Sequence, residues 1–244
     1  IALVGVITVN ALANILPING MNTGQISDLY PSLFTPAGFT FSVWSLIYLS
    51  LIVFSVAQFQ IKDKSYFKEL SLWFILSCIS NISWILAWHY EFVSLSVVIM
   101  LVLLYSLLKI YSTVQSTRPH KLWDNVFILT MSSVYLGWIS VATIANVTAL
   151  LVSKDWSGMG ISEPMWASVM IIIAALLGIL AILNRQDIPY ALVIIWAIWG
   201  IFSKQSVQES DASQMVATIA KYAGTMLFIY SILTSVGRRT YYNL

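Results

Sequence analysis

The sequence predicts an all-α fold, a polytopic membrane bundle of about eight transmembrane helices. Apolar residues make up 59% of the 244 residues and charged residues only 9%, whereas ordinary soluble proteins contain about 45–50% and about 25%. So few charges cannot cover a water-facing surface, and lipid must therefore cover most of the molecule. The apolar runs are continuous, which favours helices over the alternating segments of about ten residues that build a membrane β-barrel.

Eight apolar segments supply the predicted helices, because a backbone in lipid must satisfy its own hydrogen bonds. About 20 helical residues cross a hydrocarbon core of about 30 Å, and most of the segments have this length. In chain order they comprise residues 1–16, 40–59, 70–88, 93–111, 122–151, 165–183, 189–203 and 214–234.

Three of the segments depart from that length. The first is short, and because it starts at Ile1 without a methionine, we expect the native N-terminus to lie further upstream. The fifth is long enough to project beyond the bilayer. The seventh is marginal, so it is predicted to be either a short crossing or a partly re-entrant helix.

The distribution of basic residues predicts the orientation, because Lys and Arg gather in cytoplasmic loops. With the N-terminus in the cytoplasm, the outer loops carry only Lys154 and Lys204. The inner loops and flanks carry the larger share, namely Lys62, Lys64, Lys68, Lys109, Arg118, Lys121, Arg185, Arg238 and Arg239. This bias alternates loop by loop and supports eight crossings with both termini in the cytoplasm.

The loop before the second segment carries the most informative pattern. Residues 30–48 read YPSLFTPAGFTFSVWSLIY. Pro36 stiffens the loop, Gly38 permits a turn, and Phe41 leads into the helix. In that helix Trp44 and Tyr48 are i, i+4 neighbours on one face. By residue type alone, an aromatic belt at the membrane interface explains this pattern.

The order of these residues resembles the TspO/MBR family of tryptophan-rich sensory proteins and translocator proteins. Their loop reads W-x-P-P-G-W-x-F-x-x-V-W-x-x-L-Y, and Pro36, Gly38 and Phe41 match it in register. Trp44 and Tyr48 follow in order, with one residue fewer between Phe41 and the helix.

Two later stretches are similar to the same family, in the same order. Asn81 and Trp84 match the pattern N-x-x-W in the third segment. In the fifth, Trp138, Ala142 and Asn146 match the pattern Y-x-x-W-x-x-F-A-T-x-x-N. The resemblance covers about residues 1–151. It predicts a five-helix bundle over residues 1–152 and a three-helix extension over residues 153–244.

The resemblance implies a pocket beneath the first loop that binds a flat hydrophobic ligand, most of all a tetrapyrrole such as porphyrin or haem. Sterol binding has less support, because no tyrosine precedes the basic residue at the end of the fifth segment. Light-dependent porphyrin breakdown, known in some members, leaves open whether the chain is an enzyme. The ligand-binding residues implied are Pro36, Gly38, Phe41, Trp44, Tyr48, Asn81, Trp84, Trp138, Ala142 and Asn146.

Polar residues inside the segments allow simpler interpretations too. Asn81 and Asn146 are expected to form hydrogen bonds between helices, with ligand contact as the second option. Lys221 is the deep charge of the last segment, and it either snorkels to the interface or meets a ligand propionate or a partner's carboxylate. A retinal Schiff base is disfavoured, because no acidic counter-ion occupies the middle of another segment.

The remaining candidates are weak. His89 and His120 fall at segment ends on opposite sides, so they cannot share a metal, and no metal site is predicted. His89 could ligate a haem iron, although a place at the membrane interface explains it better. The Trp84/Trp88 and Trp196/Trp199 pairs are expected to pack or to face lipid, with a place in the pocket wall as the second option.

Two functions of different classes follow from the sequence. The first is ligand binding, with the lipid bilayer and a hydrophobic small molecule as partners. The second is an accessory or assembly subunit, in which the last three helices dock on a second copy or on other membrane subunits. A secondary transporter is disfavoured, because no inverted repeat or paired acidic residues appear. The net charge of +2 gives no indication of nucleic acid as a partner.

Overall fold

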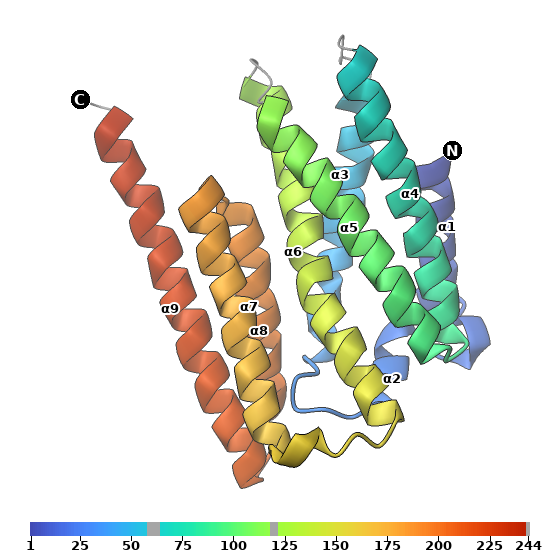
Figure 1. The fold of residues 1–244 in the computed structure, drawn as a ribbon, viewed down its shortest axis with the longest axis vertical. Coiled ribbons are helices and arrows are strands. Elements are labelled where there is room, and N and C mark those ends of the chain that lie inside the picture. Colours follow the sequence, from blue (N-terminus) through green and yellow to red (C-terminus); the bar gives the residue numbers. More distant parts are fainter. Residues whose placement is uncertain (58–63, 118–121, 243–244) are drawn as a thin grey trace. The chain divides into compact units, whose positions relative to one another are not determined.

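The computed structural model describes residues 1–57, 64–117 and 122–242. Within these ranges the chain is a series of helices without strands (Figure 1). The predicted inner residues Lys62, Arg118 and Lys121 lie outside the described residues, as does His120. The chain divides into two compact units, which are described separately below.

The first unit comprises Ile1–Tyr30 and Ser42–Ser153. A 3₁₀ turn, Ile18–Gly20, and a short helix, α2 (Thr23–Asp28), follow its first helix. Its long helices are α1 (Ala2–Ile15), α3 (Val43–Ala57), α4 (Lys64–His89), α5 (Val93–Thr117) and α6 (Leu122–Ser153).

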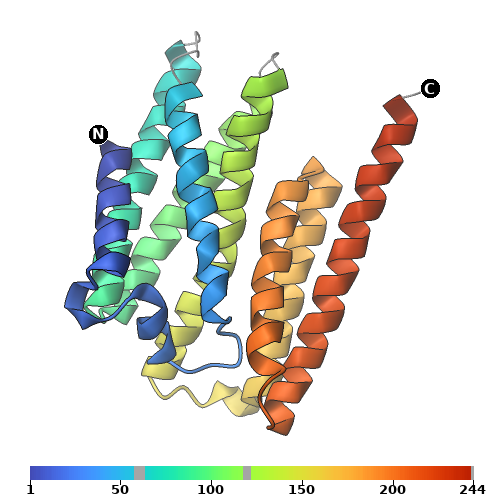
Figure 2. The ribbon, with the colours of Figure 1, turned by 180° about the vertical axis from the view of Figure 1, so that it is seen from behind.

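These five helices form a closed ring of neighbours. Helix α4 packs against α1 and α5, α5 against α6, α6 against α3, and α3 against α1 (Figures 1 and 2). Large apolar side chains fill the interior, among them the fully buried Ile47, Ile85, Leu103 and Ile139. The opposite faces expose residues such as Leu72 and Leu95, as expected of helices that face lipid.

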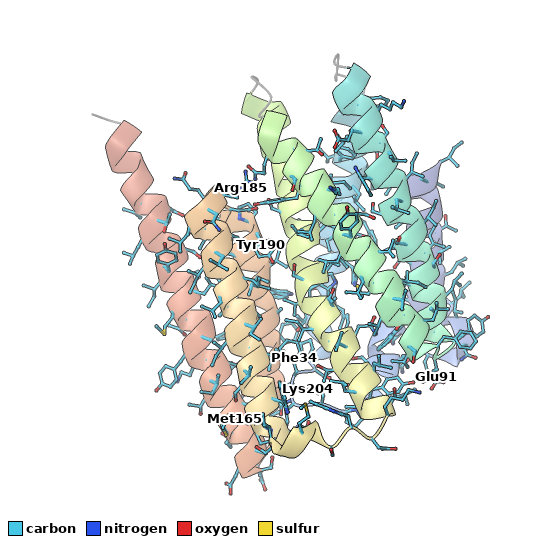
Figure 3. All side chains as sticks on the ribbon, viewed as in Figure 1. Phe34, Glu91, Met165, Arg185, Tyr190 and Lys204 are labelled. Atoms are coloured by element: carbon cyan, nitrogen blue, oxygen red, sulfur yellow. The ribbon has the colours of Figure 1, made fainter. Side chains whose placement is uncertain are left out.

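The second unit comprises Pro31–Phe41 and Lys154–Leu244. Its helices α7 (Glu163–Arg185), α8 (Ile188–Gln205) and α9 (Asp211–Tyr242) pack against one another in all three pairs. A 3₁₀ turn, Gly158–Gly160, precedes α7. At the turn between α7 and α8, which Figure 3 marks with Arg185 and Tyr190, the Asp187 side chain caps α8 by accepting a hydrogen bond from Tyr190 N at 3.0 Å.

Two glycines set the spacing of α9 against its neighbours. A Cβ added to Gly178 of α7 would lie 2.7 Å from Leu227 Cδ2 of α9, and one added to Gly224 of α9 would lie 3.2 Å from Ile198 of α8. Small residues at such positions let helices approach closely in membranes. The α7–α9 and α8–α9 contacts therefore depend on these two positions.

The helices have the lengths that a membrane requires. Among the described residues, seven are long and apolar enough to cross it, and α1 is a shorter apolar helix of 14 residues, about 21 Å long. Helix α8 is continuous over 18 residues, so the seventh segment is a helix of about 27 Å without a re-entrant break. The prediction of a polytopic helical membrane bundle is confirmed.

The predicted domains, residues 1–152 and 153–244, stay a prediction, and one segment lies in a different compact unit from the one in which the sequence groups it. We call Pro31–Phe41 the motif loop. The sequence places this loop with the five-helix bundle, whereas in the structure it belongs to the compact unit of α7, α8 and α9. The physical reason is a set of hydrogen bonds to α7 and α8 that the sequence pattern does not show.

The orientation can be tested with cysteines placed at both predicted sides. The native thiol of Cys78 is buried, so it should contribute little background. In intact cells, Leu29→Cys, at an exposed position after α2, should react with a membrane-impermeant maleimide. Asn184→Cys, exposed in the last turn of α7, should react only after permeabilisation and leaves the basic residues unchanged. Labelling with the opposite dependence would show that the predicted orientation is inverted.

Candidate functional site

Trp44 and Tyr48 of α3 form an aromatic cluster with side chains of α6. The rings of Trp44 and Tyr48 stack with centroids 5.6 Å apart and an interplanar angle of 20°. Trp138 meets the Trp44 ring edge-on at 6.4 Å, and Tyr135 meets it edge-on at 5.9 Å. Aromatic pairs prefer both arrangements. We call Trp44, Tyr48, Tyr135 and Trp138 the aromatic wall.

The wall has a buried part and a partly exposed part. Tyr135 and Trp138 are only 2% and 3% exposed, whereas Trp44 and Tyr48 are half-buried. Ala142, one turn after Trp138, is half-buried as well. The α3 rings thus keep accessible surface while the α6 rings support them. Tyr135 is absent from the predicted site residues, although it opens the Y-x-x-W pattern that points to Trp138.

Asn81 of α4 joins three helices through its side chain. Its Oδ1 accepts a hydrogen bond from Asn10 Nδ2 of α1 at 2.7 Å, and its Nδ2 donates to Tyr135 Oη of α6 at 3.1 Å. Asn81 is fully buried, so neither water nor lipid competes for these bonds. The network therefore fixes Tyr135, which is also a member of the aromatic wall.

Asn146 of α6 forms a second network, about one turn further along α4 than Asn81. Its Oδ1 accepts from Trp84 Nε1 of α4 at 2.9 Å, and its Nδ2 donates to Ser96 Oγ of α5 at 2.9 Å. The Trp84 ring stacks on that of Trp88 with centroids 5.7 Å apart. These bonds connect α4, α5 and α6, and they are those expected of interhelical packing.

His89 at the end of α4 has both ring nitrogens within hydrogen-bond distance of oxygen atoms. Nδ1 lies 3.0 Å from the Ile18 carbonyl oxygen, and Nε2 lies 3.2 Å from Thr23 Oγ1. Because a carbonyl only accepts, Nδ1 is assigned the proton and Nε2 accepts from Thr23. His89 is completely buried, so it holds the connection after α1 in place. Among the described residues no cluster of metal ligands occurs.

Tyr30 closes the same connection over the end of α4. Its hydroxyl donates to Glu91 Oε2 at 3.3 Å, and its ring lies 6.0 Å from that of Trp88. Burial, followed by the nearby Glu91 carboxylate, raises the pKa of Tyr30 above its usual value of 10.0. The tyrosine therefore remains protonated and donates to Glu91 throughout the physiological pH range.

The predicted loop residues Pro36, Gly38 and Phe41 lie in the second unit. Pro36 is buried, Phe41 is half-buried and Gly38 is exposed. A Cβ added to Gly38 would meet no atom within 4 Å, and its φ is not in the left-handed region. The turn here therefore does not require glycine, in contrast to what the sequence suggested. The other seven predicted site residues all lie in the first unit.

Three further candidates lie in the second unit, namely Lys221, Trp196 and Trp199, and they differ in exposure and in contacts. Lys221 is exposed on α9, ten residues after Asp211 and therefore about 15 Å along the helix. Its role in snorkelling or in binding a carboxylate stays a prediction. Trp196 donates from Nε1 to the Thr40 carbonyl at 3.0 Å. Trp199 is 52% exposed and contacts Phe202, with centroids 5.2 Å apart.

The Asn146 network should contribute measurably to stability. Asn146→Ala removes the acceptor for Trp84 Nε1 and the donor to Ser96, so buried polar groups lose their partners. We expect unfolding in detergent to become easier by about 1–3 kcal/mol. Asn14→Ala is the matched control, because Asn14 is exposed and bonds only within α1. Equal losses of stability for both variants would contradict a structural role for the network.

The comparisons with known proteins place the chain in a family. The model of the family described as TSPO-like protein matches residues 1–233. Neither a curated protein nor a solved structure matches the chain. The match is consistent with the resemblance to the TspO/MBR family, but it extends beyond residue 151 and includes α7, α8 and most of α9. With most of its length matched, this helical membrane protein belongs to the TSPO-like family.

Proposed function

We propose that this TSPO-like protein binds a flat hydrophobic ligand, most of all a tetrapyrrole of the porphyrin or haem type, against its aromatic wall. The observation that supports this function best is the half-buried ring of Trp44. It stacks on Tyr48 and is supported by Tyr135 and Trp138. A rigid aromatic surface of this kind suits a planar macrocycle, because stacking buries a large apolar area at once.

The wall needs little rearrangement before a ligand binds. Tyr135 is held by Asn81 through a hydrogen bond of 3.1 Å, and Trp138 is packed in the interior. Side chains that are already ordered lose little conformational freedom on binding, so more of the stacking energy remains as affinity. The residues Asn81, Trp84 and Asn146 then contribute by fixing α6, the helix that carries Tyr135 and Trp138.

The side chains of the aromatic wall and the bonds of His89 favour recognition of the macrocycle itself over ligation of a bound metal. The four side chains of the wall are uncharged aromatics, and the nitrogens of His89 are both engaged by oxygen atoms of the α1–α2 connection. An axial bond from His89 to iron would require its hydrogen bond to Thr23 to break. We therefore expect the macrocycle itself to provide the binding energy, whether or not it contains iron.

The alternative function as an assembly subunit rests on the last three helices. The family match includes them, so they need no separate docking role to explain their presence. Exposed side chains on α9, such as Tyr222 and Met226, fit lipid as well as they fit a partner. The assembly function therefore stays a prediction without a structural observation in its favour.

Binding can be tested by titrating the purified protein in nanodiscs with protoporphyrin and following tryptophan fluorescence. Trp44→Ala removes the central ring, and we expect the Kd to rise roughly five- to thirtyfold, as for a loss of about 1–2 kcal/mol. Trp73→Ala is the matched control. Trp73 lies in the same unit, is half-buried and packs edge-on against Tyr105 at 5.6 Å. If Trp73→Ala weakens binding as much as Trp44→Ala, the ligand does not bind at the wall.

The proposal that binding does not depend on iron in the macrocycle gives a second test. Metal-free protoporphyrin and haem should bind with Kd values within about threefold, which is less than 1 kcal/mol. Free imidazole added to the haem complex should shift the Soret band, because an axial position of the iron remains available. A wild-type spectrum of histidine-ligated haem that changes in His89→Asn would instead assign His89 as the axial ligand and contradict this expectation.

A further inference from the structure

The motif loop is fixed to α8 through its backbone. Ala37 N donates to the Gly200 carbonyl at 3.0 Å, and Trp196 Nε1 donates to the Thr40 carbonyl at 3.0 Å. The ring of Phe39 also lies edge-on against Trp196, with centroids 5.4 Å apart. One turn of α8 thus holds both ends of the Ala37–Thr40 stretch.

A second contact point lies at Leu33. Its N–H donates to Glu163 Oε1 of α7 at 2.9 Å, and its carbonyl accepts from Gln205 Nε2 of α8 at 3.1 Å. Gln205 is only 3% exposed, and the neighbouring Phe34 is 1% exposed. Phe34 lies near the Lys204 end of α8 (Figure 3). Both backbone polar groups of Leu33 are therefore satisfied by α7 and α8.

The fit between the loop and α8 is also steric. Thr40 is completely buried and lies directly against Gly200. A Cβ added to Gly200 would overlap Thr40 Oγ1 and lie 2.9 Å from Thr40 Cγ2. Only glycine at position 200 leaves room for the loop at this distance.

The motif loop continues along the chain directly into α3, the helix that carries Trp44 of the aromatic wall. The 3₁₀ turn Gly38–Ser42 follows Ala37, and α3 begins at Val43, one residue before Trp44. We propose that Trp196, Gly200 and Gln205 are positioning residues: by holding the motif loop they fix the first turn of α3 and hence the ring of Trp44. This inference rests on the proposed function in one respect: Trp44 belongs to the aromatic wall, against which the ligand is proposed to bind.

The regular structure of the motif loop is the 3₁₀ turn at its end, Gly38–Ser42. In addition, Thr35 N donates to Ser32 O at 3.1 Å and Thr40 N donates to Ala37 O at 3.0 Å. An irregular segment of this kind loses conformational entropy when it is fixed, and outside contacts must offset that loss. The hydrogen bonds and packing of the loop against α7 and α8 offset this loss of entropy.

Two measurements without ligand test the proposal. Hydrogen exchange reports the order of the loop amides, and ¹⁹F NMR of protein labelled with 5-fluorotryptophan reports the surroundings of Trp44. Trp44→Phe identifies the Trp44 resonance, and the resonance of Trp73 in α4 serves as the internal reference. Trp196→Phe should raise exchange at Ala37 and Thr40 roughly two- to tenfold, as for the loss of one hydrogen bond, and should shift the Trp44 resonance. The matched control Trp199→Phe should do neither.

Gly200→Ala separates loop positioning from the stability of α8, because alanine is the better helix former. This variant should displace the loop, raise exchange and shift the Trp44 resonance while the Trp73 resonance stays unchanged. Adding Thr40→Ala removes the overlapping Oγ1 and Cγ2 atoms and should restore both readouts toward wild type. If Gly200→Ala does not fold, the proposal is tested by the loop exchange and the Trp44 resonance of Trp196→Phe.

Unchanged loop exchange in Trp196→Phe would overturn the anchoring, and raised exchange with an unchanged Trp44 resonance would overturn the positioning of Trp44. Failure of the wild-type protein to bind protoporphyrin would contradict the proposed function, and both ligand-free readouts would still decide this inference.

Discussion

Backbone polar groups that leave a helix and are buried away from water have to find partners within the protein, because an unpaired buried group costs free energy. This constraint governs the connection between α1 and α3, which contains the short helix α2 and two 3₁₀ turns. Its first part is held by the end of α4, where His89 bonds Ile18 and Thr23. Its second part is held by α7 and α8, which satisfy Leu33 and Ala37. A single connection is therefore shared between the two compact units.

The same constraint orders the interior of the five-helix unit. Apolar contacts alone choose poorly between helix partners in lipid, since lipid tails are as apolar as leucine. The bonds of Asn81 and Asn146 are directional, and each joins three helices. They fix α6 against α1, α4 and α5, and the ring closes where α6 lies beside α3. The aromatic wall depends on that neighbourhood, because Trp44 and Trp138 come from these two helices.

The sequence predicted most of the fold and part of the site, for reasons that particular residues make clear. Continuous apolar runs located the helices but not their ends: α4 begins at Lys64 and α9 extends from Asp211 to Tyr242, because polar helical ends carry no apolar signal. The motif order indicated Trp44 and Trp138, which the structure places in contact. It could not distinguish Trp196 from Trp199, since an indole bond to one carbonyl leaves no periodic pattern. Nor could it assign the partner of Gln205, a backbone carbonyl 172 positions away.

The loop contacts change how the three C-terminal helices are understood. As a separable extension they would leave the five-helix unit complete without them. Without α7 and α8, however, the amides of Leu33 and Ala37 and the carbonyl of Thr40 would lose the partners they have here. Thr40 would also lose the glycine surface that buries it. These residues lead directly into α3, so under the proposed positioning role the cost of losing them would fall on the start of that helix. The family match through residue 233 includes α7, α8 and most of α9 together with the five-helix unit.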